Sequence, residues 1–562
     1  MNMNPVTYLC LCAAFMSSPA TAQFFPPAPP LADTATLVVD LLDASPDEKL
    51  VGTSVQGLLN KNEARVYLLL APWDRFWLDY LTEAGHIGAR KTISLPALCA
   101  QYQEQIKAII QIDPELPASI NVATMMASVK DGIVVAPGMD VPHAAEAVSI
   151  DLTGRWQSNV EAYRWALDAL LPRMNPSLLA SYHPQACNHH LRDYLISRNV
   201  FHFWITSETQ PGNTPENHAA ERAFFDDVMA ATPPNMPVLG FWYSGVDPGL
   251  DEYTGVGLAG EYGKITVVSD WATNLSFLGS ITVDTAAAVQ DYMRRLTTEA
   301  PALDPEKTYL CFDIVESGDA PSYVQSRQYE VWQDTLRGEL PINWSLGPAL
   351  FDLAPPIAAY FYNQATANDY IYMAISGAGY CHPWRNMFMN NDAPEQAWRA
   401  YIGITRQYLE RMAYSAIGLY TDAWKPYNRV QRDAVLRRFA DSLPQTESFI
   451  LGMGRDDGIG RNTSTYFLDK KRDTIISHVM TRWPTDYADK TREENIHWLA
   501  QDIREHAPTT QPGFMHVMAL SWVFGPAELM EVRQQLGDDF VPLTIPQFNT
   551  LFRKHYQDNE AE

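Results

Sequence analysis

The feature that most constrains this sequence is a repeated alternation between short apolar runs and longer stretches with helical periodicity. From Thr34 onward, the runs TLVVDLL and ARVYLLL are followed by apolar residues at helical spacing, through Leu50–Asn60 and around Arg75–Ala84. The runs GIVVAPG and FHFWIT continue the same rhythm. Parallel strands need a crossover connection that is usually a helix, so this pattern is typical of βαβ units. We therefore expect an α/β fold with largely parallel sheets.

A second series of apolar runs begins near Pro237. Eight runs are separated mostly by helical patterns: Pro237–Trp242, Lys264–Ser269, Thr308–Val315, Pro341–Leu346, Tyr370–Ser376, Ser415–Tyr420, Ser448–Met453 and Phe514–Leu520. About eight strands with roughly six intervening helices predict a (β/α)8-like barrel, which can be regular or distorted. A doubly wound sheet has the same local pattern and stays an alternative.

The chain of 562 residues is too long for one ordinary core, so we divide it. Residues 1–22 are predicted to be a signal peptide, because an apolar run ends in Ala20-Thr21-Ala22 before Gln23, although no Lys or Arg precedes it. Residues 23–33 form a proline-rich leader, 34–232 an N-terminal α/β region and 233–562 the barrel-like region. The signal predicts a secreted or periplasmic protein.

Composition excludes some partners. The formal net charge is -25, whereas nucleic acids and anionic membranes require clustered Lys and Arg. No later apolar run is long enough to span a bilayer. The four cysteines beyond the signal are widely spaced without a CxxC pair, which predicts buried thiols rather than disulfides or a zinc site: Cys99, Cys187, Cys311 and Cys381.

The segment SGAGYCHPW, Ser376–Trp384, directly follows a predicted strand. Its glycines allow a sharp turn or a close approach to a ligand, and Tyr380 and Trp384 supply ring faces. A packing turn is the plainer interpretation. The segment lacks the GxGxxG and GK[ST] patterns of nucleotide sites, and the chain has no GxSxG nucleophile elbow. We expect no cofactor.

Residues 377–383, GAGYCHP, resemble the motif that names the GxGYxYP family, described as putative glycoside hydrolases, with His382 where the family usually has Tyr. The resemblance extends over most of the chain after the signal. It includes VQGLLNKNEARVYL, similar to a "QGL-N" segment, NHHLRDYLISRNVFHF, similar to an LRDY segment, the run LPINWSL to GAGY, and the closing segments PGFMHVMALSW and LGDDFVPLTIPQFNTLFRK. This resemblance implies a carbohydrate substrate.

Glycoside hydrolysis uses two carboxyl groups that flank the bond. The family carries an SDGDN-like stretch after the third barrel strand, where this chain has ESGDA at 316–320. The resemblance therefore favours Asp319 as a catalytic residue, paired with Glu316 or Asp422. A helix cap or a solvated loop is the alternative role for each acid. Residues that follow other strands, together with His516 inside the last predicted strand, are predicted to bind substrate: Asp270, Tyr380, His382, Trp384, Trp424, Asp456 and His516.

Two other functions stay open. The altered 316–320 stretch is compatible with a carbohydrate-binding protein that has no catalytic activity. Acidic residues lie near three histidines, a combination that is also compatible with a metal-dependent hydrolase: His382, His478 and His516. No HxxxH or HxH spacing supports that second alternative, so we predict no metal site.

Overall fold

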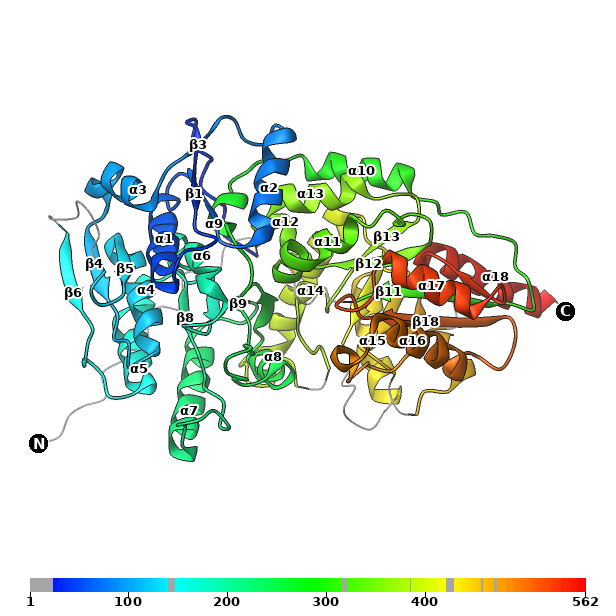
Figure 1. Ribbon diagram of the computed structural model, residues 1–562. Coiled ribbons are helices and arrows are strands. Elements are labelled where there is room, and N and C mark those ends of the chain that lie inside the picture. The colour runs from blue at the N-terminus through cyan, green and yellow to red at the C-terminus, as the bar shows by residue number, and fades with distance from the viewer. Residues whose placement is uncertain are drawn as a thin grey trace, which may run out of the picture.

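The computed structural model describes residues 24–139, 147–315, 321–384, 386–420, 429–455, 458–469 and 473–561. The predicted signal peptide lies outside these residues. The molecule has two halves: an N-terminal half with three small sheets and a C-terminal half built on one nine-stranded sheet (Figure 1).

The first two sheets consist of parallel strands, as the βαβ pattern predicted. The first has the order β2-β1-β3 and contains β1 (Thr36–Asp40), β2 (Val66–Leu69) and β3 (Arg90–Thr92), with helices α1 (Pro46–Leu59), α2 (Pro72–Glu83) and α3 (Leu95–Gln101). The second has the order β5-β4-β6 and contains β4 (Ala108–Gln111), β5 (Gly132–Val135) and β6 (Val148–Asp151), with α4 (Ala118–Lys130) and α5 (Asn159–Ala169).

Helix α1 shows how local chemistry defines an element. Ser45 accepts the N–H of Glu48 on its hydroxyl, and the Glu48 carboxylate accepts the N–H of Ser45 at 2.9 Å. This capping box satisfies two of the free N–H groups at the helix start, and Pro46 fits the first helical position.

The third sheet has the order β10-β9-β7-β8, and all its pairs are parallel. It contains β7 (Leu179–Ser181), β8 (Phe201–Phe203), β9 (Pro237–Gly240) and β10 (Ile265–Val268), with α6 (Arg192–Ser197), α7 (Pro215–Ala231) and α8 (Glu252–Glu261). Here the structure differs from expectation, because the sequence placed β9 and β10 in the barrel. The strand-helix alternation is the same in both architectures, and only the pairing of β9 with β7 reveals where β9 belongs.

The C-terminal sheet has the order β16-β17-β15-β14-β13-β12-β11-β18, with β19 paired to β11. Its strands are β11 (Thr308–Ile314), β12 (Ile342–Leu346), β13 (Asp369–Met373), β14 (Ala416–Leu419), β15 (Ser448–Leu451), β16 (Thr465–Phe467), β17 (Ile475–His478), β18 (Gly513–Ala519) and β19 (Phe540–Pro542). A parallel bridge joins Val479, after β17, to His516 in β18, so the sheet curls as a half-barrel. The α/β class is confirmed, while a (β/α)8 barrel is not.

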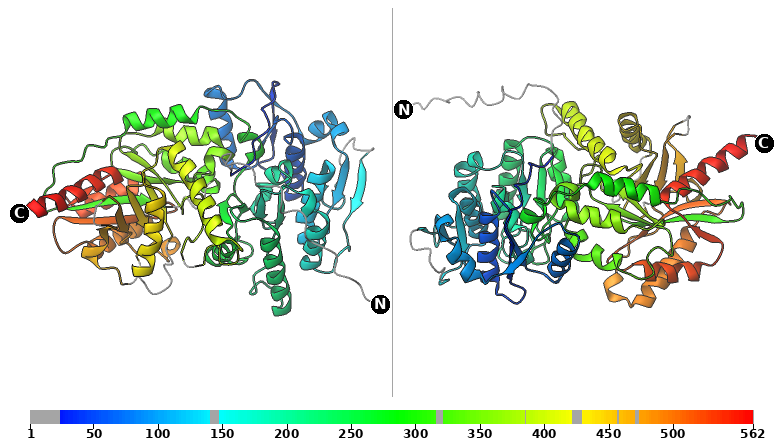
Figure 2. Two further views of the ribbon diagram at one scale, coloured as in Figure 1. Left: turned by 180° about the vertical axis from the view of Figure 1, so that it is seen from behind. Right: turned by 90° about the horizontal axis from the view of Figure 1, so that it is seen from above.

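Helices surround the curled sheet (Figure 2). They are α10 (Thr285–Arg295), α11 (Tyr329–Trp332), α12 (Leu350–Leu353), α13 (Pro355–Gln364), α14 (Pro394–Met412), α15 (Arg429–Ser442), α16 (Arg492–His506), α17 (Pro526–Leu536) and α18 (Ile545–Ala561). The short helix α9 (Leu275–Leu278) lies in the N-terminal half, where it contacts α6. An aromatic seam joins the two halves: Trp77 on α2 packs edge-on against Tyr360 on α13 at 5.3 Å, and its Nε1 donates to the Gln325 carbonyl at 3.1 Å.

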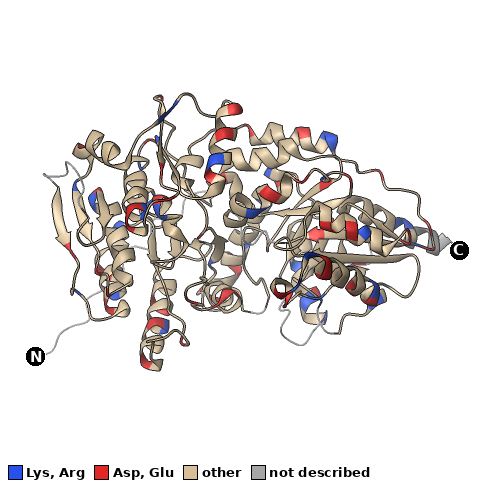
Figure 3. Ribbon diagram, viewed as in Figure 1, with Lys and Arg blue, Asp and Glu red and all other residues tan. Residues whose placement is uncertain are grey.

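Acidic side chains outnumber basic ones, and both kinds are spread over the two halves (Figure 3). Cys99, Cys187, Cys311 and Cys381 are buried and free, as predicted. Among the described helices, none combines the length and the apolar character that crossing a membrane requires.

Candidate functional site

Asp270 follows β10 and lies where the third sheet meets the C-terminal half. Its side chain is buried, with the residue 7% exposed. Oδ1 accepts the Ser322 hydroxyl at 3.1 Å, and Oδ2 accepts the Cys187 thiol at 3.6 Å. Burial raises the pKa of Asp270 to about 6, against the hydrogen bonds from Ser322 and Cys187, which lower it. Such a carboxyl keeps its proton up to about pH 6, well above the usual range of an aspartate, and a general acid must hold a proton.

Two exposed tryptophans accompany this carboxyl. Trp271 is 44% exposed and Trp522, after β18, is 46% exposed. The Trp271 N–H donates to Ser322 Oγ at 2.8 Å, and the ring of the next residue, Tyr323, lies edge-on to Trp522 at 5.4 Å. The flat faces of such exposed indoles suit sugar rings.

The loop that carries Cys187 to Asp270 has a strained backbone. Four of its residues have positive φ: Cys187 (58°), Asn188 (47°), His189 (62°) and Leu191 (64°). Each costs roughly 1–3 kcal/mol and persists only where surrounding contacts impose it. Here the Tyr182 hydroxyl donates to the His190 carbonyl at 2.5 Å, and the Leu191 N–H donates to the Ala272 carbonyl at 2.8 Å. Strain of this kind is concentrated at functional sites.

Residues far away in the sequence hold the loop after β10. Gln56 donates to Asn274 Oδ1 at 2.7 Å, and Asn60 donates to Ser276 Oγ at 3.0 Å. Asp193 accepts the N–H of Ser276 at 2.9 Å. Gln56 and Asn60 belong to the "QGL-N" segment and Asp193 to the LRDY segment. These two segments therefore position the loop that carries Asp270.

The GAGY turn after β13 joins the two halves. Tyr380 pairs with Thr266 of β10 through two backbone hydrogen bonds of 2.9 and 3.0 Å. Gly377 has a φ of 75°, which favours glycine. A Cβ on Gly379 would lie 2.7 Å from Ile265 Cγ2, so glycine is required for this close approach to β10.

Tyr380 and His382 share an aromatic group that is distinct from the Asp270 group. The Tyr380 hydroxyl donates to Glu252 Oε1 at 2.8 Å, and its ring lies 5.7 Å from His382 and 5.0 Å from Tyr420. Burial raises the pKa of Glu252, while the hydrogen bond from Tyr380 opposes that shift. Trp384 is half-buried at the end of the same segment.

Five of the predicted site residues fall outside the described residues. They are the three predicted catalytic acids and two predicted substrate-binding residues: Asp319, Glu316, Asp422, Trp424 and Asp456. Their roles stay predictions. The sequence did not indicate Cys187 or Ser322 as partners of Asp270. Trp522 follows the last predicted strand, Phe514–Leu520, and the sequence indicated no role for it. Its position after a strand was the feature that could have indicated a site residue.

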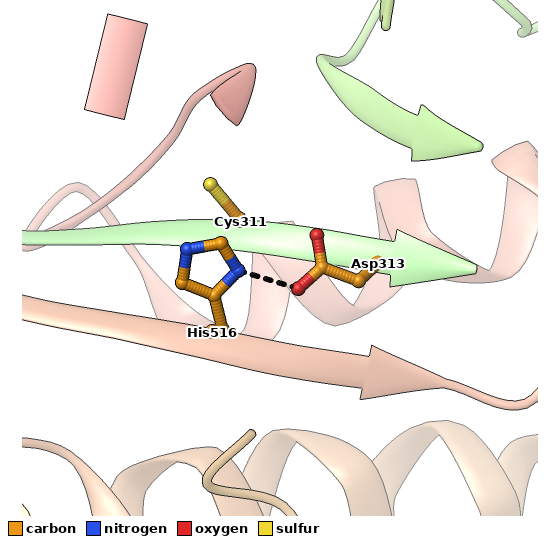
Figure 4. Close-up of side chains that lie close together, drawn as sticks. All are labelled: Cys311, Asp313 and His516. Atoms are coloured by element: carbon orange, nitrogen blue, oxygen red, sulfur yellow. Dashed lines mark hydrogen bonds and ion pairs between the residues drawn. The ribbon is translucent and has the colours of Figure 1, made fainter. Parts of the chain in front are cut away.

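His516 lies inside β18, where the sequence placed it. Its Nδ1 is 2.7 Å from Asp313 Oδ2 on the adjacent β11, and Cys311 stands opposite His516 in the strand register (Figure 4). Ligand atoms of these three buried residues lie within 4.8 Å of one another, so the group has the donors for a metal ion. Burial raises the pKa of Asp313 and of Cys311, which favours their neutral forms. A contribution of His516 to substrate binding stays a prediction.

A second group with metal-binding donors is Asp502, Glu505 and His506. Arg482 already pairs with Asp502 at 2.5 Å and with Glu505 at 3.5 Å, so a cation would have to displace the guanidinium.

Three small parallel sheets followed by a larger curled sheet define an α/β protein of several units. Models of the GxGYxYP first, second and third N-terminal domains match residues 35–104, 106–174 and 176–280. The model described as "GxGYxYP putative glycoside hydrolase C-terminal domain" matches residues 306–553. The chain belongs to the GxGYxYP family.

A solved structure shows the same fold. It is the crystal structure of a putative hydrolase from Bacteroides thetaiotaomicron, with 20% sequence identity and a TM-score of 0.76. The similarity covers 95% of this chain and 97% of that one. No curated protein matches the sequence.

Proposed function

We propose that this protein is a glycoside hydrolase that cleaves a poly- or oligosaccharide outside the cytoplasm, with Asp270 as its proton donor. The observation that carries the proposal is a buried carboxyl with a pKa of about 6 beside the exposed ring of Trp271. Family membership supports the reaction class, and the small-residue pattern at 20–22 supports export.

The chemistry needs a proton on the leaving oxygen as the glycosidic C–O bond breaks. Asp270 supplies that proton, and water provides the hydroxyl that completes the product. The hydrogen bonds from Ser322 and Cys187 fix the orientation of the carboxyl group. Trp271 and Trp522 offer ring faces on which the sugars bind.

The second carboxylate acts as base or nucleophile. We assign it to the predicted set Asp319, Glu316 and Asp422. Asp319 stands three residues before Ser322 in the sequence, and Ser322 bonds Asp270, which supports this choice. Tyr380, His382, Trp384, Trp424 and Asp456 complete the proposed substrate-binding set.

The test is release of reducing ends from a broad glycan panel by the purified protein. We expect release by the unchanged chain and by Asp168→Asn, which alters an exposed acid on α5, and almost none by Asp270→Asn. Glycan binding without any release would instead favour the carbohydrate-binding alternative. Loss of release on addition of a chelator would favour the metal-dependent alternative.

A further inference from the structure

A cavity of about 400 Å³ opens at the carboxyl edge of the four-stranded sheet. His183 follows β7, Trp204 follows β8 and Asp247 follows β9, and all three line the cavity. The sheet has the order β10-β9-β7-β8, so β7 and β9 are neighbours at its centre. The chain runs from β7 to β8 at one edge and from β9 to β10 at the other, so the two connections leave in opposite directions. Such switch points create crevices in which α/β proteins bind ligands.

The cavity walls are polar but carry no positive side chain. The lining includes five amides and three carboxyl groups, and neither Lys nor Arg is among the described lining residues. The amides are Asn159, Gln185, Gln210, Asn213 and Asn217. An anionic ligand such as a phosphate or a carboxylate would meet no compensating cation.

The carboxyl groups are not arranged for a cationic ligand either. Asp247 accepts three protein donors: Trp204 Nε1 at 2.8 Å on Oδ2, and the N–H groups of Ser207 and Gly249 at 3.0 Å each on Oδ1. Glu221 accepts the N–H of Thr206 at 2.8 Å, and burial raises its pKa to about 7. Asp247 is thus committed within the protein, and Glu221 is half neutral at neutral pH. The third lining carboxyl group, Glu115, is exposed to solvent.

His183 supplies a neutral donor. Burial lowers its pKa to about 4, so the ring is uncharged at neutral pH. Nδ1 accepts the N–H groups of Gln185 at 3.2 Å and Ala186 at 3.0 Å, which leaves the single ring proton on Nε2.

We propose that this cavity is a second carbohydrate site, separate from Asp270, which binds one or two neutral sugar units. Each sugar hydroxyl both donates and accepts, which matches amides, a protonatable carboxyl and a neutral histidine. The volume is near the lower end of ligand pockets, roughly 300–1,000 Å³, and suits a mono- or disaccharide. The site goes beyond hydrolysis, because it holds a sugar without cleaving it.

The test is isothermal titration calorimetry on the whole protein carrying Asp270→Asn, which prevents turnover. The probes are glucose, galactose, mannose, xylose and their common disaccharides, with glucosamine, glucuronic acid and inorganic phosphate as charged comparisons. We expect a neutral sugar to bind. Gln185→Ala and Asn217→Ala, which change exposed lining residues, should each weaken it by about tenfold, while Gln364→Ala on α13 has no effect.

Two further variants separate this site from the Asp270 site. Asn217→Trp places a ring over the cavity and should abolish sugar binding, whereas Trp271→Ala should leave it intact. Binding that survives Asn217→Trp, binding lost with Trp271→Ala, or tighter binding of the charged probes would overturn the proposal. Full reducing-end release by Asp270→Asn in the otherwise unchanged chain, with cavity binding intact, would contradict only the assignment of Asp270 as proton donor.

Discussion

Asp270 and Asp313 are both buried acids with a raised pKa, yet their surroundings differ. Asp313 lies inside β11 with none of its surface exposed, and its partner His516 is 1% exposed. Asp270 lies beyond the end of β10, and the next residue, Trp271, is 44% exposed. Burial alone therefore does not identify a catalytic acid. The exposed ring of the next residue distinguishes the Asp270 region from the Asp313 region.

The strongest test of this contrast is Asp270→Asn. We expect kcat to fall by about 10²–10⁴-fold, the usual contribution of a general acid. The fold should persist, because the amide oxygen still accepts the Ser322 hydroxyl. Steady-state kinetics together with thermal unfolding measure both effects, with Asp168→Asn as the matched control. An unchanged kcat would remove Asp270 from the reaction.

Asp313→Ala should lower the stability and leave kcat unchanged, the reverse of Asp270→Asn. Removing one member of a buried pair leaves His516 without its partner, and we expect the free energy of unfolding to fall by about 3 kcal/mol. The kcat per folded molecule should not change. Urea unfolding and kinetics on the folded fraction check this. A collapse of kcat at unchanged stability would place the Asp313 region in the active site.

The exposed indoles should act on substrate affinity. Trp271→Ala and Trp522→Ala should each raise KM by up to about tenfold, because a stacked ring contributes about 1 kcal/mol, while kcat changes less. Leu336→Ala, at a side chain that is 40% exposed, is the matched control. If both tryptophan variants retain the KM of the unchanged chain, these rings are not a substrate surface.

The smallest effect is a shift of the pH profile. A proton donor with a pKa of about 6 is active below that pH and loses activity as the pH rises through it. The hydrogen bond from Ser322 lowers the pKa of Asp270, so Ser322→Ala should move the falling limb of the profile to higher pH. A limb that stays in place, or moves to lower pH, would show that another group controls the reaction.

The sequence predicted the elements better than their assembly. Six strands from β11 to β18 lie where apolar runs predicted them, because a buried parallel strand is a local pattern. In this sheet the sequence missed β16, β17 and β19. It also assigned β9 and β10 to the wrong sheet, because strand pairing depends on contacts far along the chain. Asp270 was found as a residue that follows a strand. Its partner Cys187 follows β7 of the same sheet and its partner Ser322 follows β11 of the C-terminal sheet, both far from Asp270 in the sequence, so no local pattern could reveal them.

The most direct test of the account is a crystal structure of the Asp270→Asn variant with an oligosaccharide that the unchanged chain cleaves. We predict a sugar ring on Trp271 and the glycosidic oxygen within about 3 Å of the side chain at position 270. An oligosaccharide bound with its scissile bond beside other acids, and away from position 270, would contradict the account.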